Sequence, residues 1–342
     1  MPRINVNQNI DEDFEYVDKT CVNYTTNNGR RIIPIDESQS QHVVLDELLE
    51  HHDADVGADN VFRPTFTASR YEREWFFRYL GPFYDEAQIT DVLFKIKGGK
   101  EATVYCCASP DVDGVGLVAA KIYRPRMFRN LRNDVRYRQN RNVLNGYGKV
   151  VRDERLTRAM QKGTDIGKGA LQVSWMQHEY HALQTLFAAG VKVPKPIATG
   201  ENVILMEYFG DRDIPAPALQ EVHLSRTEAE SLFNALVKDV DTMLGCGYVH
   251  GDLSAFNVLF FDGDYRIIDL PQAVTPDQNP DAKDIFLRDV TRLSQYFRRY
   301  GIESRPEQLA QNMWRKYRYR DDPLGEKKEF INLMQEPEDQ ED

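Results

Sequence analysis

The chain has 342 residues and a formal net charge of -11. This length is enough for one two-lobed domain, or two small domains, with a full hydrophobic core. The longest apolar runs are far too short to cross a bilayer, and the first residues lack the basic-then-apolar order of a secretory signal. The four cysteines form neither a CxxC metal pair nor a disulfide framework. We therefore expect a cytoplasmic protein with reduced thiols and no association with membranes.

Charge is distributed unevenly along the chain. Residues 1–61 hold about thirteen acidic residues against about four basic ones, and the end, EPEDQED, is acidic throughout. This composition predicts an acidic, disordered N-terminal segment over residues 1–65 and an acidic tail over 331–342. Between Lys121 and Lys168, about fourteen cations oppose only about four acids, which predicts a mobile basic flap over residues 124–168. Such a flap is typical of a surface that binds polyanions such as RNA.

In chain order, the first predicted elements are strands. FKIKGGKEATVYCCAS alternates around a Gly-Gly turn, and GLVAAKIYR has a β-rich composition, so residues 94–123 are predicted to form a small antiparallel sheet. WMQHEYHALQTLFAAG has apolar residues at helical spacing and stops at Gly190, a candidate C-cap. KVPKPIATGENVILMEYFG then predicts two more strands around a Gly-Glu-Asn turn.

Helices dominate the second half of the chain. TEAESLFNALVKDVDTMLGCG opens with a candidate capping box of Thr227 and Glu230. VLFF and YRII, joined by Asp-Gly-Asp, predict a β-hairpin. DAKDIFLRDVTRLSQYFRRYG and RPEQLAQNMWRKY predict two further helices, the second with Pro306 near its first turn. A strand-rich half followed by a helix-rich half predicts an α+β fold.

Three oxygen-bearing side chains flank the predicted hairpin. Asp252 and Asn257 lie five residues apart in HGDLSAFN, and Asp269 follows YRII. The hairpin would return Asp269 to the vicinity of Asn257. A carboxylate and an amide oxygen brought together suit Mg²⁺, which keeps some waters and bridges substrate phosphates. Each residue alone also fits a role as a loop or strand-end cap, but their joint spacing favours a catalytic loop with a metal site.

These motifs resemble those of a known family. HGDLSAFN resembles the catalytic loop of the protein-kinase-like superfamily, and IIDLPQAV is similar to the metal-binding loop of the RIO family of atypical protein kinases. KGGKEATVY resembles the RIO nucleotide loop, AAKIYR and HEY supply its lysine and glutamate, LMEYFG its hinge, and IPAPAL and FLRDV are further RIO hallmarks. The resemblance covers about residues 90–300 and favours the first RIO subfamily.

This resemblance implies a two-lobed, protein-kinase-like RIO fold over residues 66–330. A small antiparallel β-rich N-lobe would span about residues 66–206, followed by a hinge at 206–210. A helical C-lobe would span 211–330.

The resemblance also implies roles for individual residues. Lys121, paired with Glu179, would hold the α- and β-phosphates of ATP. Asp252 would orient the acceptor as a catalytic residue, while Asn257 and Asp269 would bind Mg²⁺, or Mn²⁺ in its place. Asp269 is a second candidate catalytic residue, because the RIO resemblance implies that it takes the phosphoryl group as an acyl-phosphate that water then releases. The other expected ATP-binding residues are Gly98, Gly99, Lys100, Glu101, Met206, Glu207 and Phe209.

The implied function is that of an ATP- and Mg²⁺-dependent serine/threonine protein kinase, an ATPase, or both. The basic flap would bind RNA or a ribosomal particle as a partner. Two alternatives stay open. A small-molecule phosphotransferase of the aminoglycoside or choline kinase type shares HGDL with an Asn five residues after the Asp. An inactive nucleotide- or RNA-binding module fits the arginine-rich flap, although the presence of all the candidate site residues argues against it.

Overall fold

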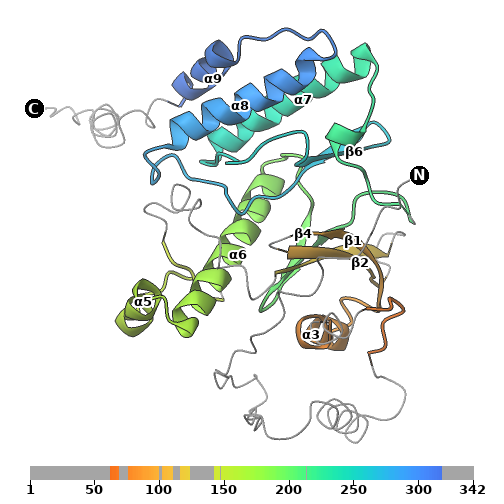
Figure 1. The fold of residues 1–342 in the computed structure, drawn as a ribbon, viewed down its shortest axis with the longest axis vertical. Helices are drawn as coiled ribbons and strands as arrows, with labels where there is room; N and C mark the ends of the chain where they lie inside the picture. The colour runs from red at the N-terminus through yellow and green to blue at the C-terminus, as the bar shows by residue number, and fades with distance from the viewer. Residues whose placement is uncertain are drawn as a thin grey trace, which may run out of the picture.

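The computed structural model describes residues 62–68, 76–99, 102–110, 116–123, 142–146, 148–212 and 214–317. These residues form an N-lobe built on a sheet and a helical C-lobe (Figure 1), so the α+β, two-lobed fold is confirmed. Most of the expected acidic N-terminal segment, the flap residues 124–141 and the tail 331–342 lie outside the described residues.

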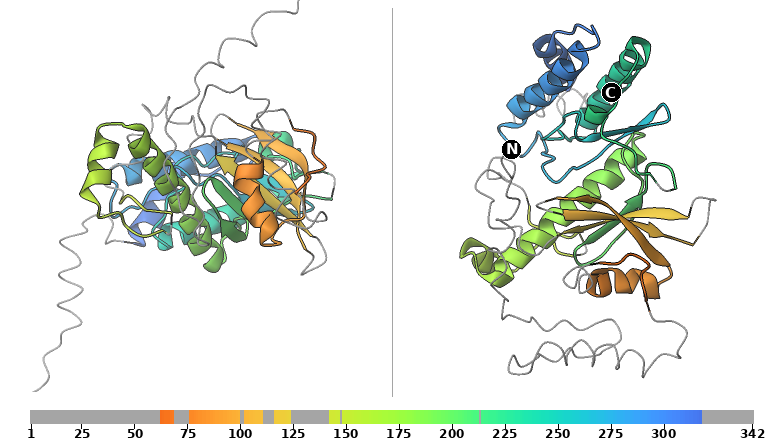
Figure 2. Two further views of the ribbon diagram at one scale, coloured as in Figure 1. Left: turned by 90° about the horizontal axis from the view of Figure 1, so that it is seen from below. Right: turned by 45° about the vertical axis from the view of Figure 1, so that its right-hand side comes forward.

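The N-lobe sheet is antiparallel throughout. Within the described residues its strand order is β1-β2-β3-β5-β4, and the strongly twisted sheet is seen in the right-hand view of Figure 2. The strands are β1 (Asp91–Gly98), β2 (Ala102–Ala108), β3 (Leu117–Tyr123), β4 (Pro196–Thr199) and β5 (Val203–Glu207). The sheet predicted from alternation is therefore present, and β4 and β5 join it as the two further predicted strands.

The two faces of this sheet have different partners. Strand β3 sends Val118, Ala120 and Ile122 into a buried cluster with the short helices η1 (Phe76–Leu80) and α3 (Gly81–Asp85). Because successive strand residues point to opposite faces, the alternate positions Ala119 and Lys121 face the other way. The period of β3 thus places Lys121 on the face of the sheet opposite α3.

The chain joins the N-lobe core before the expected domain boundary at residue 66. Phe62 is buried in the cluster under the sheet. The Thr65 backbone N–H donates a hydrogen bond to Asp91 Oδ1 at 2.7 Å, at the start of β1. Residues 62–65 are therefore part of the packed N-lobe.

Two helices follow β3 in the described chain, α5 (Glu154–Gln161) and α6 (Asp165–Ala188). α6 is the long helix that runs from α5 to the C-lobe in Figure 1. The prediction of a mobile flap is wrong for its described part, because residues 142–168 contain a β-bridge between Leu144 and Val150, the whole of α5 and the first turn of α6.

The capping residues explain why this basic stretch is helical. The Asp153 side chain accepts from the Arg155 backbone N–H at 2.7 Å, and the Thr164 hydroxyl accepts from the Gly167 N–H at 3.2 Å. Each cap satisfies a backbone donor that the first helical turn leaves free. Both caps are readable in the sequence, since Asp and Thr are favoured N-cap residues.

The C-lobe contains most of the helices. Its elements are η3 (Leu219–Glu221), α7 (Arg226–Gly245), β6 (Val258–Phe261), β7 (Asp264–Ile267), α8 (Ala282–Arg298) and α9 (Pro306–Arg315). The predicted hairpin is present as β6 and β7, which pair in antiparallel register. Among the described helices, none has both the length and the apolar character that a bilayer span requires.

The predicted capping box of α7 is wrong by two residues. Ser225 is the N-cap, and its hydroxyl accepts from the Glu228 backbone N–H at 3.3 Å. The Glu228 carboxylate in turn accepts from the Ser225 N–H at 2.8 Å. Both Ser225 and Thr227 precede a Glu by three residues, so the sequence pattern alone does not distinguish them.

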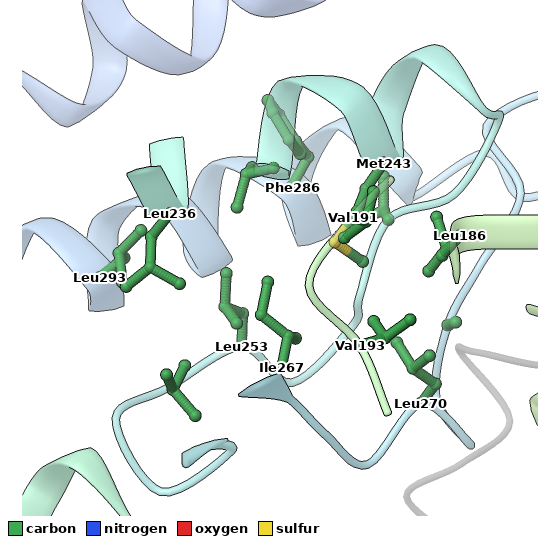
Figure 3. Close-up of a cluster of buried hydrophobic side chains, with 14 of the residues drawn as sticks. Leu186, Val191, Val193, Leu236, Met243, Leu253, Ile267, Leu270, Phe286 and Leu293 are labelled. Atoms are coloured by element: carbon green, nitrogen blue, oxygen red, sulfur yellow. The ribbon is translucent and has the colours of Figure 1, made fainter. Parts of the chain in front are cut away.

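The main hydrophobic core anchors the loops that bear the candidate site. Figure 3 shows Leu253 near Leu236 of α7 and Leu293 of α8, and Leu270 beside Val193, within the same buried cluster. Leu253 directly follows Asp252, and Leu270 directly follows Asp269. Because fully buried leucines are costly to displace, the core determines where these two carboxylates lie.

Candidate active site

Lys121 connects the two lobes at the centre of the candidate site. Its Nζ lies 2.8 Å from Glu179 Oε1 on α6 and 2.8 Å from Asp269 Oδ1 after β7. The Lys121 and Glu179 side chains are 10% and 3% exposed, whereas Asp269 is 45% exposed. Three side chains distant in sequence therefore meet, with only the Asp269 carboxylate open to solvent.

The charges of this cluster reinforce one another. Burial opposes the charge on Lys121, but Asp269 and Glu179 outweigh burial and raise the pKa of the lysine above its usual value. The adjacent Lys121 ammonium holds the pKa of the Asp269 carboxyl below its usual range. Lys121 is therefore a cation and Asp269 an anion at neutral pH.

A second contact holds α6 against the loop after β7. The Trp175 indole Nε1–H donates to the Pro271 carbonyl at 2.6 Å. Asp269 itself adopts a positive φ of 69°, in the left-handed region that non-glycine residues seldom occupy. The bond to Pro271 holds the loop just after Asp269, and a bond from the Ile268 N–H to the Asn257 carbonyl holds it just before.

Asp252 and Asn257 form the other half of the site. Asn257 Nδ2 donates to the Asp252 carbonyl at 2.9 Å and lies 3.3 Å from Asp252 Oδ2. The Asn257 carbonyl accepts from the Ile268 N–H at 2.9 Å, which places Asp269 beside this pair, as the predicted hairpin requires. Because the amide nitrogen of Asn257 faces Asp252, its amide oxygen is the atom left to bind a metal.

These side chains fit a metal that keeps part of its water shell. Within the described residues, no group of three or more His, Cys, Asp or Glu side chains could hold a metal ion alone. One carboxylate and one amide oxygen match the few protein ligands of Mg²⁺ at a nucleotide site, where phosphates and waters complete the coordination. The donor set does not suit zinc, which takes three or four nitrogen or sulfur ligands.

His250 was not singled out by the sequence patterns, and it connects the two loops. Its Nδ1 lies 3.3 Å from the Asp252 backbone N–H, and its Nε2 lies 3.1 Å from the Ile268 carbonyl. Because Nδ1 accepts a hydrogen bond from the Asp252 backbone N–H, Nε2 carries the ring hydrogen and donates to the Ile268 carbonyl. The histidine therefore holds the two loops at a set separation.

Helix α8 supports the loop that bears Asp252. The Gly251 N–H donates to the buried Asp289 Oδ2 at 2.8 Å, and Arg288 donates to the Gly251 carbonyl. Gly251 has a φ of +87°, and a Cβ there would lie 2.2 Å from the Gln272 carbonyl oxygen. The FLRDV motif contains both supporting residues. The sequence alone does not predict their contact with Gly251, which lies 37 and 38 residues away.

The nucleotide loop is described only in part. Gly98 ends β1 opposite Thr103, and the Gly99 N–H donates to the Ala102 carbonyl at 2.9 Å in the hairpin turn. The Gly99 amide is therefore engaged in the turn and is not free to bind a phosphate. The other two expected residues of this loop, Lys100 and Glu101, lie outside the described residues.

The hinge side chains serve a structural role that the sequence did not predict. Arg266 on β7 binds both oxygens of Glu207, with distances of 2.8 and 3.1 Å, and its guanidinium lies 4.6 Å from the ring centre of Phe209. The Glu207 N–H donates to the Lys195 carbonyl, and the Phe209 carbonyl accepts from Ala216. An adenine base would have to use the remaining backbone groups of the hinge.

An apolar cluster covers the face of the sheet opposite α3. It contains Cys106, Ala119 and Tyr208, with Val104 and Met206 packed against them. Of these, only Met206 was predicted as a site residue. Ala119 lies two residues before Lys121 on β3, and Val104 on β2 pairs with Lys121, so strand alternation and pairing could have identified both as the floor for a base.

The Asp264 carboxylate, which pairs with Lys192 and Arg266, makes a pH-dependent contribution to the free energy of unfolding. Partial burial alone would raise the pKa of Asp264, but hydrogen bonds from Lys192 and Arg266 outweigh it and lower the pKa from 3.8 to about 2. A folded-state pKa below the unfolded value stabilises the fold above the unfolded pKa, and this stabilisation is lost as pH falls through the folded value. We expect Asp264→Asn to be less stable than the wild type near neutral pH.

Urea unfolding at several pH values would measure this effect. The difference in free energy of unfolding between wild type and Asp264→Asn should shrink as pH falls from about 4 to about 2. Asp262→Asn, at the exposed turn of the same hairpin, is the matched control and should show no such trend. A difference that is constant across this pH range would mean that the Asp264 carboxylate is not stabilised by its cations.

Comparisons with known proteins give the family of the chain. The family model of the RIO domain (RIO1) matches residues 137–309, about half of the chain. The chain is 34% identical over 215 residues to the RIO-type serine/threonine-protein kinase Rio1 of Haloferax volcanii, covering 63% of this chain and 66% of that protein. It is 30% identical over 248 residues to the serine/threonine-protein kinase RIO1 of Caenorhabditis elegans, covering 70% of this chain and 42% of that protein.

The human serine/threonine-protein kinase RIO1 is also similar, at 29% identity over 216 residues, 63% of this chain and 34% of that protein. The matches therefore span between about a third and about two thirds of the length of these relatives. Rio1 proteins are among the relatives, as the resemblance to the first subfamily predicts. The chain belongs to the RIO family of serine/threonine-protein kinases.

Proposed function

We propose that this protein transfers the γ-phosphoryl group of ATP to a serine or threonine hydroxyl. The observation that carries the proposal is the position of Lys121 Nζ, 2.8 Å from both Glu179 and Asp269. A buried lysine held between two carboxylates is a positioned cation for the α- and β-phosphates. The apolar cluster around Ala119 and Met206 would cover the adenine base.

Each residue then has a separate task. Lys121 binds the α- and β-phosphates, and Glu179 keeps its ammonium in place. Asp252 orients the acceptor hydroxyl and takes its proton while the hydroxyl oxygen bonds to the γ-phosphorus and the bond to the ADP oxygen breaks. Asn257 supports Asp252 through its amide N–H and offers its oxygen, with the Asp269 carboxylate, as a metal ligand. A bound Mg²⁺ or Mn²⁺ would neutralise charge that develops on the phosphates.

The family resemblance adds an ATPase reaction to this proposal. Asp269 Oδ1 is paired with Lys121, while the side chain stays nearly half exposed. A carboxylate oxygen of Asp269 would attack the γ-phosphorus, ADP would leave, and water would hydrolyse the resulting acyl-phosphate to inorganic phosphate. The exposure of Asp269 supports access for both the nucleotide and that water.

Incubation with γ-labelled ATP and Mg²⁺ tests the proposed function. We expect label transfer to a generic basic protein or to the chain itself, and none to an aminoglycoside or choline. An acid-stable label would mark serine or threonine phosphate, whereas a label lost in hydroxylamine would mark an acyl-phosphate on Asp269. Transfer to the small molecules alone would replace this proposal with a small-molecule phosphotransferase.

Partner and location are also part of the proposal. Exposed cations on and near α5, such as Arg152, Arg155 and Lys162, support an RNA or ribosomal particle as a partner of the basic region. The buried free thiols of Cys106 and Cys107 suit a reducing cytoplasm, since burial raises the pKa of each thiol and makes it unreactive.

A further inference from the structure

A cation on α8 lies directly against the proposed catalytic carboxylate. Arg292 Nη1 donates to Asp252 Oδ1 at 2.7 Å, while Asp252 Oδ2 faces the Asn257 amide at 3.3 Å. The Arg292 and Asp252 side chains are 41% and 44% exposed. Both oxygens of the carboxylate therefore have a donor, and the donor on the solvent side is a guanidinium.

Arg292 is not needed to hold the catalytic loop. Arg288, one helical turn earlier on the same face of α8, already binds the Gly251 carbonyl, and Asp289 binds the Gly251 N–H. An exposed ion pair such as Arg292–Asp252 contributes little to stability. Its position at the acceptor side of the site therefore points to a role in recognising the acceptor.

Most N–H donors of the Arg292 guanidinium are not used by Asp252. A guanidinium carries five N–H donors in a planar fork that matches a carboxylate. In the part of the chain that the structure describes, its single bond is the one to Asp252. The remaining donors are available to an anion that approaches from solvent, next to the position of an acceptor hydroxyl.

We propose that Arg292 determines acceptor specificity by binding an Asp or Glu carboxylate of the acceptor peptide close to its serine or threonine. This inference rests on the proposed kinase function. The peptide carboxylate binds the Arg292 donors that Asp252 does not use, and this contact places the acceptor hydroxyl next to the Asp252 carboxylate.

One further feature favours a peptide acceptor, and the net charge of the chain makes a local cation necessary for an acidic one. Phe256, four residues after Asp252 on the same loop, is 58% exposed and offers an apolar contact beside the acceptor position. The chain as a whole carries a net charge of -11 and repels acidic peptides at long range. Selection of an acidic acceptor therefore requires a local cation, and Arg292 supplies it next to Asp252.

The test compares two acceptor peptides on the full-length protein. One has glutamates on both sides of a single serine, and the other has glutamines at the same positions. With γ-labelled ATP, we expect the wild type to favour the glutamate peptide by about tenfold in kcat/KM, equivalent to one carboxylate–guanidinium contact. In Arg292→Gln the preference should fall to within about twofold. Arg292→Lys should keep only part of it, because an ammonium lacks the planar fork.

Arg298→Gln is the matched control. Arg298 lies on the same helix, carries the same charge and is exposed, so its loss changes the net charge without changing the Asp252 contact. It should keep the wild-type preference. Thermal unfolding would establish that each variant is folded, and fluorescence anisotropy with the labelled glutamate peptide gives a readout of binding without catalysis. Binding should weaken with salt in the wild type and be reduced in Arg292→Gln.

The possible outcomes separate this inference from the proposed function. Equal use of both peptides by the wild type, or the same glutamate preference in Arg292→Gln, overturns the role of Arg292 while kinase activity stands. A rise in transfer to both peptides alike in Arg292→Gln would make the pair a general block and also overturns specificity. Absence of transfer to any peptide or protein overturns the proposed function, and the inference with it.

Discussion

Asp252→Asn should reduce phosphoryl transfer to a protein acceptor by about 10²–10⁴-fold, the range typical of the loss of a general base. An amide cannot take the hydroxyl proton, and it removes the negative charge that orients the acceptor. ATP affinity should stay within a few-fold of the wild type, because the residues assigned to the phosphates are Lys121 and the metal ligands. Initial rates with γ-labelled ATP and calorimetric titration with nucleotide would measure the two effects separately.

The structure supplies a control for this variant. The strongest bond from Asn257 goes to the Asp252 backbone carbonyl at 2.9 Å, which the substitution leaves unchanged, so the loop should keep its shape. Asp262→Asn, at an exposed hairpin turn where Asn tolerates the positive φ of 48°, should be close to the wild type in both measurements. Near-full turnover by Asp252→Asn would remove Asp252 from its proposed role.

Asp269→Asn should abolish transfer and weaken Mg²⁺-dependent ATP binding by about tenfold or more, because a charged metal ligand becomes neutral. It also removes one of the two carboxylates that pair with Lys121, leaving the lysine with Glu179. If Asp269 also accepts the phosphoryl group, the acyl-phosphate label should disappear as well. Calorimetry with and without Mg²⁺ gives the metal-dependent part of the affinity.

Asn257→Ala separates the metal from the ion pair. It removes the amide oxygen but does not touch Lys121, so it should weaken binding with Mg²⁺ and leave metal-free nucleotide binding unchanged. Of these two variants, only Asp269→Asn changes both the metal-dependent part of nucleotide binding and the ion pair with Lys121. Asn257→Ala changes the metal-dependent part alone. Unchanged metal dependence in both variants would place the metal ligands elsewhere in the chain.

Local patterns in the chain predict most of the secondary structure. Alternation and β-rich composition predict β1 to β3, two short strand runs around an Asp-Gly-Asp turn predict the β6–β7 hairpin, and helical patterns predict α7, α8 and α9. These predictions succeed because the pattern of apolar residues follows the periodicity of each element. The β6–β7 turn also brings Asp269 beside Asn257, because a short hairpin has one register. The spacing in HGDLSAFN likewise suffices to identify Asp252 and Asn257 as a pair.

Errors occur where two local signals compete. Ser225 and Thr227 both fit a capping box, and only the entry of the chain into α7 selects Ser225. Residues 142–168 have a high density of cations, which favours a mobile flap, but Asp153 and Thr164 begin two helices there. In each case the sequence offers more than one local signal, and the local pattern that the chain uses is the one that satisfies the backbone groups at the helix start.

Contacts between distant segments depend on the tertiary structure. Arg292 meets Asp252 across 40 residues, and Arg266 meets Glu207 across 59. Neither contact follows from any periodicity, because a charged side chain on a helix or strand looks the same in sequence whether it faces solvent or a partner. The main core decides between these outcomes. By burying Leu253 in the cluster with residues of α7 and α8, it brings the loop that bears Asp252 within reach of α8 and makes Arg292 the neighbour of Asp252.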